Sequence, residues 1–575
     1  MRILGVHEGH NASACLLEDG QIKYCIQEER LTNQKNYFGF PVKSIKKIFA
    51  LANINAEELD FVAMSSFYVS RPHNVLTAYK EQSTSYKTLM RKEQLLGLMK
   101  KTSLYTFIRN RIVVNRRKNE RLKDLAKVGI SEKRVIFVDH HLCHASAAYY
   151  GSPWKEEKIL VFTNDGSGDE LCSTVYIGKD GNLNKIAETP AGNSIGNIYS
   201  RVTFMLGLIP WEHEWKVMGM APYAPENGAK KSYEVFKKYL RIPDGSLTFE
   251  RGIPEPTYLI YPRLRRELEF HRFDWISAGL QRFTEELLCK WIKNAIKKTG
   301  IRKVALGGGV FMNVKANKRI MEMSEIEDIF IFPSCGDESN AIGAAYWVYA
   351  EKCREIGKEV DIPPLREIYF GPSFTDNDVE EVLSTIDDIK FSYEYIDDIE
   401  KRIAELLAEG KIVARCKGRM EFGARALGNR SILADSSNYR CVRTINMMVK
   451  RRDFWMPFAP VIMKEREKEY IINPKNIQAP YMMLSFDTTE KRSELIAAVH
   501  QADLTARPQI IEEAWNPEYY KILKEFEKET GRGVLLNTSF NLHGYPIVYG
   551  PKEALWVFSN SGLEYLALGD YLIEK

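Results

Sequence analysis

Apolar stretches broken by short polar turns recur along the whole chain. The first thirty residues predict a strand over 1–6, a tight turn at 18–20 and a second strand over 21–27. The same order returns about 155 residues later, where a fixed spacing indicates an internal repeat. There, residues 158–163 predict a buried strand that leads into a polar, glycine-containing loop over 164–169. The chain therefore has two similar halves, each opening with strand, loop, strand and Asp-Gly turn.

A duplicated unit of this kind is typical of the actin-like and sugar-kinase ATPases, which build two lobes around a nucleotide. After the repeat, residues 303–311 predict a strand that runs into a glycine loop, and 341–348 predict a helix packed through small residues. Pro363 and Pro364 then interrupt the pattern. We predict one α/β domain over 1–365 and a second α/β domain over 366–575.

Composition narrows the class of protein. The 575 residues carry 81 basic and 76 acidic side chains, a net charge of +5, which does not indicate a nucleic-acid-binding protein. Nine scattered cysteines without a Cys-x-x-Cys pair argue against a disulfide scaffold or a structural zinc site. The N-terminus lacks a signal-peptide pattern, and no stretch is long and apolar enough for a membrane span. We expect a cytoplasmic globular protein without a membrane partner.

One segment departs from this charge balance. Between Lys80 and Lys127 there are fourteen Lys/Arg and four Asp/Glu. An anionic substrate or a nucleic acid would suit such a stretch, but a solvated face of amphipathic helices fits it as well.

The sharpest local motif is the segment 139–145, which holds three of the ten histidines. His140 and His144 are four residues apart, so on a helix their imidazoles share one face. Asp165 and Asp337 each follow a predicted strand and could complete a set of two histidines and two aspartates. Imidazole with carboxylate suits Fe(II), Mn(II) or Zn(II) better than Ca or Mg. The alternative is a hydrogen-bonded helix start that binds no metal.

Two glycine loops after strands predict a phosphate site. Glycine lets backbone amides approach an anion closely, and two such loops in duplicated halves favour a nucleotide cleft over ordinary turns. The glycines concerned are Gly166, Gly168, Gly307, Gly308 and Gly309.

The second domain gathers cations among glycines. Arg419, Arg425 and Arg430 lie in one glycine-containing segment, with Lys450 and Arg507 further along. Guanidinium groups bind phosphate through two parallel hydrogen bonds, and lysine supplies a point charge. Clustering in loops rather than along a helix favours capture of a small anion, although a structural ion-pair network is the alternative. Residues 537–541 add amide and hydroxyl groups, among them Thr538, Ser539 and Asn541.

Ordered motifs along nearly the whole chain resemble one enzyme family. They include 10–20, 140–145, 216–222, 307–313 and 418–431, followed by 457–460 and 537–541. In this order they resemble the O-carbamoyltransferases of antibiotic and nodulation-factor biosynthesis. The resemblance implies an actin/sugar-kinase-like N-terminal domain followed by a YrdC-like domain.

The resemblance also implies a reaction. The YrdC-like domain would hydrolyse carbamoyl phosphate to carbamate and adenylate the carbamate with ATP and its Mg²⁺, releasing pyrophosphate. The N-terminal domain would then transfer the carbamoyl group to a hydroxyl of a small-molecule acceptor such as a sugar or an aminoglycoside. The family further implies Fe²⁺ or another divalent first-row metal, and a homodimer. The acceptor itself is not readable from the sequence.

Site residues follow from the same resemblance, position by position. Arg425, Lys450, Arg507 and Ser539 would bind carbamoyl phosphate and ATP, with Arg419, Arg430, Thr538 and Asn541 as neighbours. His140, His144 and Asp337 match the family's iron ligands, and Asp165 matches a further aspartate near the metal. His10 and Lys35 match polar groups at the transfer site, where His10 would act as a base. The glycines listed above would bind nucleotide, together with Asn313.

Two positions depart from the family pattern, Ala424 where proline is common and Met456 where arginine is frequent. Neither removes an expected ligand. Two other functions stay open: threonylcarbamoyl-type modification of tRNA on the basic stretch, and a non-catalytic actin-like scaffold that binds nucleotide. The complete arginine and histidine sets favour an enzyme, and the near-neutral charge favours a small acceptor.

Overall fold

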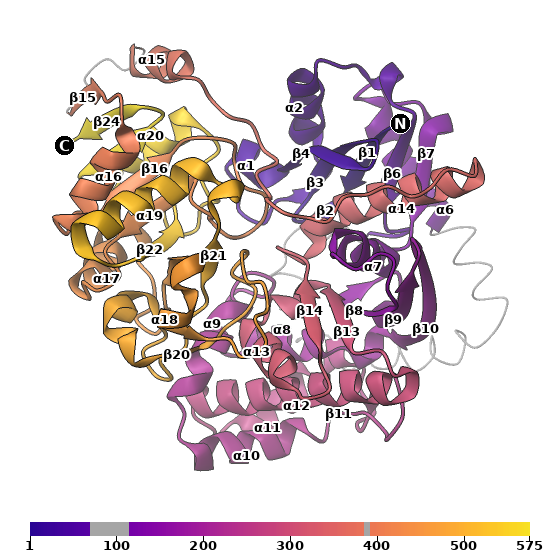
Figure 1. The fold of residues 1–575 in the computed structure, drawn as a ribbon. Helices are drawn as coiled ribbons and strands as arrows, with labels where there is room; N and C mark the ends of the chain where they lie inside the picture. The colour runs from indigo at the N-terminus through magenta and orange to yellow at the C-terminus, as the bar shows by residue number, and fades with distance from the viewer. Residues whose placement is uncertain (70–113, 385–390) are drawn as a thin grey trace. The chain divides into compact units, whose positions relative to one another are not determined.

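The computed structural model describes residues 1–69, 114–384 and 391–575 (Figure 1). The chain forms two compact units. The first comprises residues 1–23 and 37–364, and the second comprises residues 24–36 and 365–575. Residues 24–36, which the sequence-based division kept in the first domain, thus belong to the second unit. Much of the basic stretch, residues 80–113, lies outside the described residues.

The first sheet of the N-terminal half has five strands in the order β4-β3-β1-β6-β7. β1 pairs antiparallel with β3 and parallel with β6, which pairs parallel with β7. The alternation of turn residues and apolar runs explains the first hairpin, because Asp19 and Gly20 adopt the positive φ that this tight turn needs. The strands are β1 (Arg2–His7), β3 (Ser13–Glu18), β4 (Gln21–Gln27), β6 (Phe61–Ser65) and β7 (Val135–Val138).

A second sheet repeats this topology, in the order β10-β9-β8-β13-β14. In both sheets the first three strands form an antiparallel meander and the last two add in parallel to the first strand. The internal duplication predicted from the sequence is therefore confirmed in the fold. The strands are β8 (Ile159–Gly168), β9 (Leu171–Lys179), β10 (Asn182–Pro190), β13 (Lys303–Gly307) and β14 (Asp328–Ile331).

One detail of the sequence prediction is wrong. Residues 164–169 were expected to form a loop, but β8 continues to Gly168 and the chain turns at Asp169 and Glu170, both with positive φ. The strand pairing skips between Asn164 and Gly168, so a bulge interrupts the ladder there. Asn164 at this irregularity is fully buried, whereas residues 165–168 that follow it are partly or fully exposed.

Two helices are exchanged between the sheets. α7 (His140–Gly151) follows β7 of the first sheet but packs on β8, β9 and β13 of the second. α14 (Asn340–Glu355) follows β14 of the second sheet but packs on β1, β3 and β6 of the first. The two helices also pack on each other (Figure 1). Their approach needs glycine, because a Cβ on Gly343 would lie 1.8 Å from the carbonyl oxygen of Cys143.

Further helices complete the first unit. The long helix α12 packs on α10 and α13, and α8 packs on β8. Their bounds, with those of the remaining elements of this unit, are β2 (Gly9–His10), β5 (Phe38–Gly39), α2 (Val42–Ala52), α6 (Asn115–Ala126), α8 (Ile195–Met205), α9 (Glu214–Met220), α10 (Glu226–Phe236), β11 (Leu240–Arg241), β12 (Glu250–Arg251), α11 (Tyr261–Leu268), α12 (Phe273–Thr299) and α13 (Val314–Glu322).

The second unit is built on an eight-stranded mixed sheet, in the order β15-β24-β23-β16-β17-β22-β18-β21. One apolar core packs α16 and α19 on one set of strand side chains, and a second core packs α15 and α20 on another. The elements are α1 (Glu28–Thr32), α15 (Asp376–Ser384), β15 (Ser392–Tyr395), α16 (Ile399–Ala408), β16 (Val413–Cys416), β17 (Arg430–Ala434), α17 (Arg440–Ile445), β18 (Ala459–Met463), α18 (Glu467–Tyr470), β19 (Ile471–Ile472), β20 (Asp487–Thr488), β21 (Gln509–Ile511), α19 (Pro517–Thr530), β22 (Val534–Ser539), α20 (Pro551–Ser559), β23 (Tyr565–Leu568) and β24 (Tyr571–Glu574).

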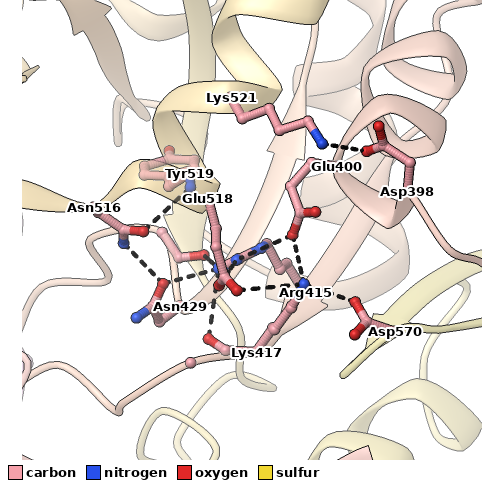
Figure 2. A network of polar contacts seen from close by, with 12 residues as sticks. Asp398, Glu400, Arg415, Lys417, Asn429, Asn516, Glu518, Tyr519, Lys521 and Asp570 are labelled. Atoms are coloured by element: carbon pink, nitrogen blue, oxygen red, sulfur yellow. Dashed lines mark hydrogen bonds and ion pairs between the residues drawn. The ribbon is translucent and has the colours of Figure 1, made fainter. Parts of the chain in front are cut away.

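A polar network ties this sheet to its helices (Figure 2). Arg415 is fully buried on β16 and donates to Glu518 at 3.1 Å and to Asn429 at 2.8 Å. Lys417 lies 2.7 Å from both Glu400 and Asp570. The buried Arg415 and the half-buried Lys417 thus both face carboxylates, the arrangement that offsets the cost of removing charge from water.

Every helix in the described ranges is too short or too polar to cross a membrane.

Candidate metal centre and anion site

The four residues predicted as metal ligands come together in the first unit. His140 begins α7 and His144 lies one turn later, Asp165 lies in β8, and Asp337 begins the short 3-10 helix 337–339 that leads into α14. One ligand atom from each residue falls within 4.8 Å of all the others. Nε2 of His140 lies 3.4 Å from Asp165 Oδ2 and 3.5 Å from Asp337 Oδ1, and Nε2 of His144 lies 3.4 Å from Asp337 Oδ1. The helix exchange explains this meeting, because it brings the starts of α7 and α14 to the ends of both sheets.

The arrangement fits a metal ion. Nε2 of His140 and Oδ1 of Asp337 are buried and lack a hydrogen-bond partner within the described structure. Buried polar atoms without partners are costly, so their convergence favours binding of a cation between them. Two imidazoles and two carboxylates are a ligand set for a divalent first-row metal. The cluster could therefore hold such an ion.

Electrostatics support the same interpretation. Burial alone would lower the pKa of His140, but the carboxylates of Asp337 and Asp165 outweigh it and raise that pKa to about 9. Burial favours the neutral acid of Asp337, yet the imidazoles of His140, His144 and His7 hold its pKa far below the usual range. Without a metal, a proton on His140 partly replaces the missing positive charge.

A four-residue segment, called the strap here, orients this cluster. It comprises residues 65–68, that is, the last residue of β6 and the three residues that follow. Ser66 has φ +65°, and its Oγ lies 3.0 Å from His140 Nδ1. The Asp169 carboxylate accepts hydrogen bonds from the backbone N–H groups of Phe67, Tyr68 and His140, at 2.9–3.0 Å. Fixing Nδ1 of a histidine in this way directs Nε2 toward the metal position.

A buried ion network holds the other side of the strap. Arg121 of α6 is fully buried, donates to the carbonyl oxygens of Ser65 and Ser66, and bonds Glu8 at 3.0 Å. Arg117 also pairs with Glu8. These two arginines of the basic stretch are therefore buried and ion-paired, and they are not available to bind a nucleic acid.

His7 is a site residue that the sequence prediction missed. It is buried at the end of β1, with Nδ1 2.7 Å from Ser65 Oγ. Its Nε2 lies 3.0 Å from the carbonyl oxygen of His10 and 3.8 Å from Asp337. Burial lowers its pKa to about 4. The only available signal was its position three residues before His10. The side chain of His10 itself is half-buried and packs edge-on against Trp211.

Most of the predicted phosphate-loop glycines pack against the metal cluster. A Cβ on Gly168 would lie 2.1 Å from the His140 ring, and one on Gly307 would lie 2.7 Å from the carbonyl oxygen of His144. Gly308, with φ +97°, similarly approaches Asn164, and the N–H of Gly309 donates to Asp165 at 3.1 Å. Gly166 has more open surroundings, with Asn197 Oδ1 4.0 Å from the position of a Cβ. Because these residues have no side chain, the backbone can lie directly against the metal-ligand residues. Their contact with nucleotide stays a prediction.

Asn313 has a local structural role. Its Oδ1 accepts from the N–H of Ala316, which caps α13, and it exchanges two hydrogen bonds with Gln281. A role of Asn313 in nucleotide binding also stays a prediction.

The second unit holds a separate cluster of cations. Burial, followed by the charges of Arg425 and Arg452, holds the pKa of Arg507 well below its usual value. Burial lowers the pKa of Lys450 strongly, with further contributions from Arg452 and Lys35. Each of these five residues, Lys35, Arg425, Lys450, Arg452 and Arg507, is thus repelled by at least one other cation of the set. Lys35 belongs to the second unit, while His10, predicted beside it at the transfer site, belongs to the first.

Lys450 is held by the residues predicted as its neighbours. It is 3% exposed and donates to Ser539 Oγ at 3.1 Å and to the carbonyl oxygen of Asn541 at 3.2 Å. Ser539 Oγ in turn donates to Asn541 Oδ1 at 2.8 Å. Thr538 is buried on β22 beside them. The sequence prediction that these residues form one site is consistent with this grouping, and their ligand stays a prediction.

The loop that carries Arg425 is fixed by buried side chains. Glu421 is fully buried, and its Oε1 accepts from the N–H groups of Leu427 at 2.8 Å and Arg430 at 3.1 Å. Asn537 donates to the carbonyl oxygen of Ala426 at 3.1 Å, and Gln509 donates to that of Leu427 at 3.1 Å. The loop is therefore preorganised, which lowers the cost of holding a ligand.

Arg430 and Arg419 both donate hydrogen bonds to backbone carbonyl oxygens of the second unit. Arg430 is fully buried and donates to the carbonyl oxygens of Gly418, Asn429 and Tyr549. Arg419 is exposed, donates to the carbonyl oxygen of Gly371 and lies over the ring of Tyr24. Their contact with substrate remains a prediction. Arg452, which was not among the predicted ligands, is a member of the cationic cluster. Met456 is 7% exposed and packs inside the unit.

Comparison with known proteins shows the family to which the chain belongs. Residues 2–346 match the carbamoyltransferase N-terminus and residues 404–575 match the carbamoyltransferase C-terminus. The chain is 31% identical over 573 residues to the nodulation protein NolNO of Sinorhizobium fredii, covering 98% of this chain and 79% of that protein. It is 34% identical over 467 residues to an uncharacterized protein of Methanocaldococcus jannaschii, covering 78% and 75% respectively.

Among solved structures, full-length HypF in its phosphate- and nucleotide-bound form covers 62% of this chain and 56% of its own, at 14% identity and a TM-score of 0.32. That likeness is too low to establish a fold. The sequence matches are decisive, because the N-terminal match alone spans more than half of the chain and the C-terminal match follows it in order. The chain belongs to the carbamoyltransferase family and is a carbamoyltransferase enzyme.

Proposed function

We propose that this enzyme is an ATP-dependent O-carbamoyltransferase that works in two steps. In the second unit, carbamoyl phosphate and water give carbamate and phosphate, and carbamate attacks the α-phosphorus of ATP to give carbamoyl-adenylate and pyrophosphate. In the first unit, the hydroxyl of a small-molecule acceptor attacks the carbamoyl carbon and AMP leaves. The order is chemically sensible because AMP leaves far more readily than an oxide ion would from carbamate.

The observation that carries the proposal is the cationic cluster of Lys35, Arg425, Lys450, Arg452 and Arg507. Burial, followed by repulsion from neighbouring cations, lowers the pKa of Lys450, Arg452 and Arg507, and a bound polyanion would favour their charged forms. Carbamoyl phosphate and the triphosphate of ATP supply that negative charge. The preorganised loop around Arg425 would fix a guanidinium for a bidentate phosphate contact. Mg²⁺ accompanying ATP is part of the proposal.

The transfer step is assigned to the first unit. His140, His144, Asp165 and Asp337 would hold a divalent first-row metal, Fe²⁺ in the family expectation. When bound, that metal supplies Lewis-acid chemistry, anchoring the nucleotide phosphate and polarising a carbonyl oxygen. His10 accepts the proton of the acceptor hydroxyl, and its backbone carbonyl is fixed by His7 at 3.0 Å. An actin/sugar-kinase-like first domain, a YrdC-like second domain and a homodimer belong to the same proposal.

The test is pyrophosphate release from the purified protein given ATP and carbamoyl phosphate, with no acceptor. We expect release that depends on carbamoyl phosphate and falls by about 10- to 150-fold in Arg507→Ala, because a hydrogen bond to a charged group is worth about 1.5–3 kcal/mol. Arg440→Ala is the matched control, since Arg440 is an exposed arginine of the same unit. His144→Ala should retain release.

A folded protein that releases no pyrophosphate would contradict the proposal and favour a non-catalytic scaffold. Tight, salt-sensitive binding of tRNA would favour threonylcarbamoyl-type modification. Against that second function, Arg117 and Arg121 of the basic stretch are already paired with the buried Glu8.

A further inference from the structure

Trp211 sits in a conformation that its side chain disfavours. Its φ is +65°, the left-handed region in which a bulky residue is an outlier. Residues are held in such conformations only where the surrounding structure determines them, and they cluster at ligand-binding and active sites. The position of this indole therefore calls for an explanation beyond packing.

The turn around Trp211 is locked at both ends. The Trp211 N–H donates to Glu214 Oε1 at 2.8 Å, at the start of α9. The N–H of His213 donates to the carbonyl oxygen of Ile209 at 2.9 Å, and the Ile209 N–H donates to His213 Nδ1 at 3.2 Å. These three hydrogen bonds fix the backbone of residues 209–214, and with it the direction in which the Trp211 side chain leaves the backbone.

The indole is presented to solvent beside the proposed base. Trp211 is 39% exposed, and its ring meets the His10 ring edge-on, with centroids 5.5 Å apart and planes at 68°. The carbonyl oxygen of His10 contacts His7, whose ring lies 3.8 Å from Asp337. A continuous chain of contacts therefore runs from the exposed indole to the His–Asp cluster.

We propose that Trp211 is the binding platform for the acceptor, and that it selects acceptors with a flat, apolar ring face bearing the reactive hydroxyl on its rim. An indole gives a large, rigid apolar surface with little conformational freedom to lose, so the C–H face of a pyranose stacks on it at low entropic cost. A ring on this platform places a rim hydroxyl toward His10. A linear polyol has no such face. This inference rests on the proposed function and names the acceptor class of the same site.

The test uses methyl glycosides of glucose, galactose and N-acetylglucosamine, with sorbitol as the linear comparison. Binding is measured by saturation-transfer NMR, and transfer is measured as label moved from carbamoyl phosphate. We expect binding of at least one glycoside and not of sorbitol. Trp211→Ala should raise the KM for that glycoside at least tenfold, whereas Trp211→Phe should retain most of the affinity. Trp556→Ala is the control, because Trp556 is a 41% exposed indole of the second unit.

A further variant separates a binding role from a structural one. Trp211→Gly suits φ +65°, so it should leave thermal stability equal or higher while losing acceptor affinity. A drop in stability with unchanged affinity would overturn the inference, as would equal binding of sorbitol and glycosides or no binding of any glycoside. Pyrophosphate release without acceptor should be normal in every Trp211 variant. Its absence from the wild-type protein would instead refute the proposed function, whatever the NMR result.

Discussion

Ser66 Oγ lies 3.0 Å from Nδ1 of His140, while Nε2 of the same ring faces Asp165 and Asp337. One ring nitrogen is thus fixed by a hydroxyl and the other is left for a metal. Ser66→Ala should lower the affinity for Co²⁺ or Fe²⁺ by about 10- to 100-fold, the usual effect of losing such a partner. Titration followed by d–d absorption of Co²⁺ would measure it. Ser146→Ala, a buried serine of α7, should bind metal normally, and equal affinity in both variants would contradict this role of Ser66.

Gly168 and Gly166 form a matched pair two residues apart in β8. A methyl group on Gly168 would lie 2.1 Å from the His140 ring, whereas one on Gly166 would find its nearest neighbour 4.0 Å away. Gly168→Ala should therefore displace His140 and abolish metal binding, and Gly166→Ala should retain it. Metal content after reconstitution, with circular dichroism as a check on folding, distinguishes them. Full metal content in Gly168→Ala would show that the ring is not the ligand.

Metal binding should release a proton near neutral pH. Because the carboxylates raise the pKa of His140 from 6.5 to about 9, the metal-free protein carries His140 protonated at pH 7. A metal must displace that proton, so its apparent affinity should rise with pH up to about 9, by roughly tenfold per unit. Calorimetry in buffers of different ionisation enthalpy counts the protons released. No dependence on the buffer would exclude His140 as a protonated ligand.

The same raised pKa of His140 determines how the stability of the metal-free protein changes with pH. A raised histidine pKa stabilises the fold fully below the unfolded value of 6.5, and this contribution is lost as pH rises toward about 9. His140→Gln should flatten that part of the profile, as denaturant unfolding at several pH values would show.

Glu421 should act on substrate affinity through the loop that carries Arg425. It is buried and accepts from the N–H groups of Leu427 and Arg430. Glu421→Ala leaves those donors unsatisfied, at a cost of about 1–3 kcal/mol each. We expect a higher KM for carbamoyl phosphate in pyrophosphate release, with Glu421→Gln partly retaining the contacts. An unchanged KM in a folded Glu421→Ala protein would contradict the positioning role.

Arg415 and Lys521 test the network of Figure 2. Arg415 is fully buried between Glu518 and Glu400, whereas Lys521 and Asp398 form a pair that is 44% exposed on each side. Arg415→Ala removes the hydrogen bonds of a buried guanidinium to Asn429 and Glu518, while Lys417 still faces Glu400. It should lower the free energy of unfolding by about 3 kcal/mol, because a hydrogen bond to a charged group contributes about 1.5–3 kcal/mol. Lys521→Ala should cost at most about 1 kcal/mol. Denaturant unfolding measures both, and similar losses would mean that the network does not depend on burial.

Much of the architecture was predictable from local patterns. The Asp-Gly turns, the apolar strand runs and the His140–His144 spacing are encoded by neighbouring residues, and the duplicated halves follow from their repetition. The prediction of a loop over 164–169 failed because polar and glycine residues there are also compatible with a bulged strand end. Only the cluster beside that strand explains why they occur.

The sequence by itself determined the residue types of the site, the repeated strand order and, through its ordered motifs, the resemblance to carbamoyltransferases. Tertiary structure alone decided that α7 and α14 are exchanged between the sheets, which brings His140, His144, Asp165 and Asp337 within 4.8 Å of one another. It also decided which residues His7, Ser66 and Trp211 contact. These contacts join residues far apart in the chain, and no local pattern of hydrophobic and polar positions encodes those distances.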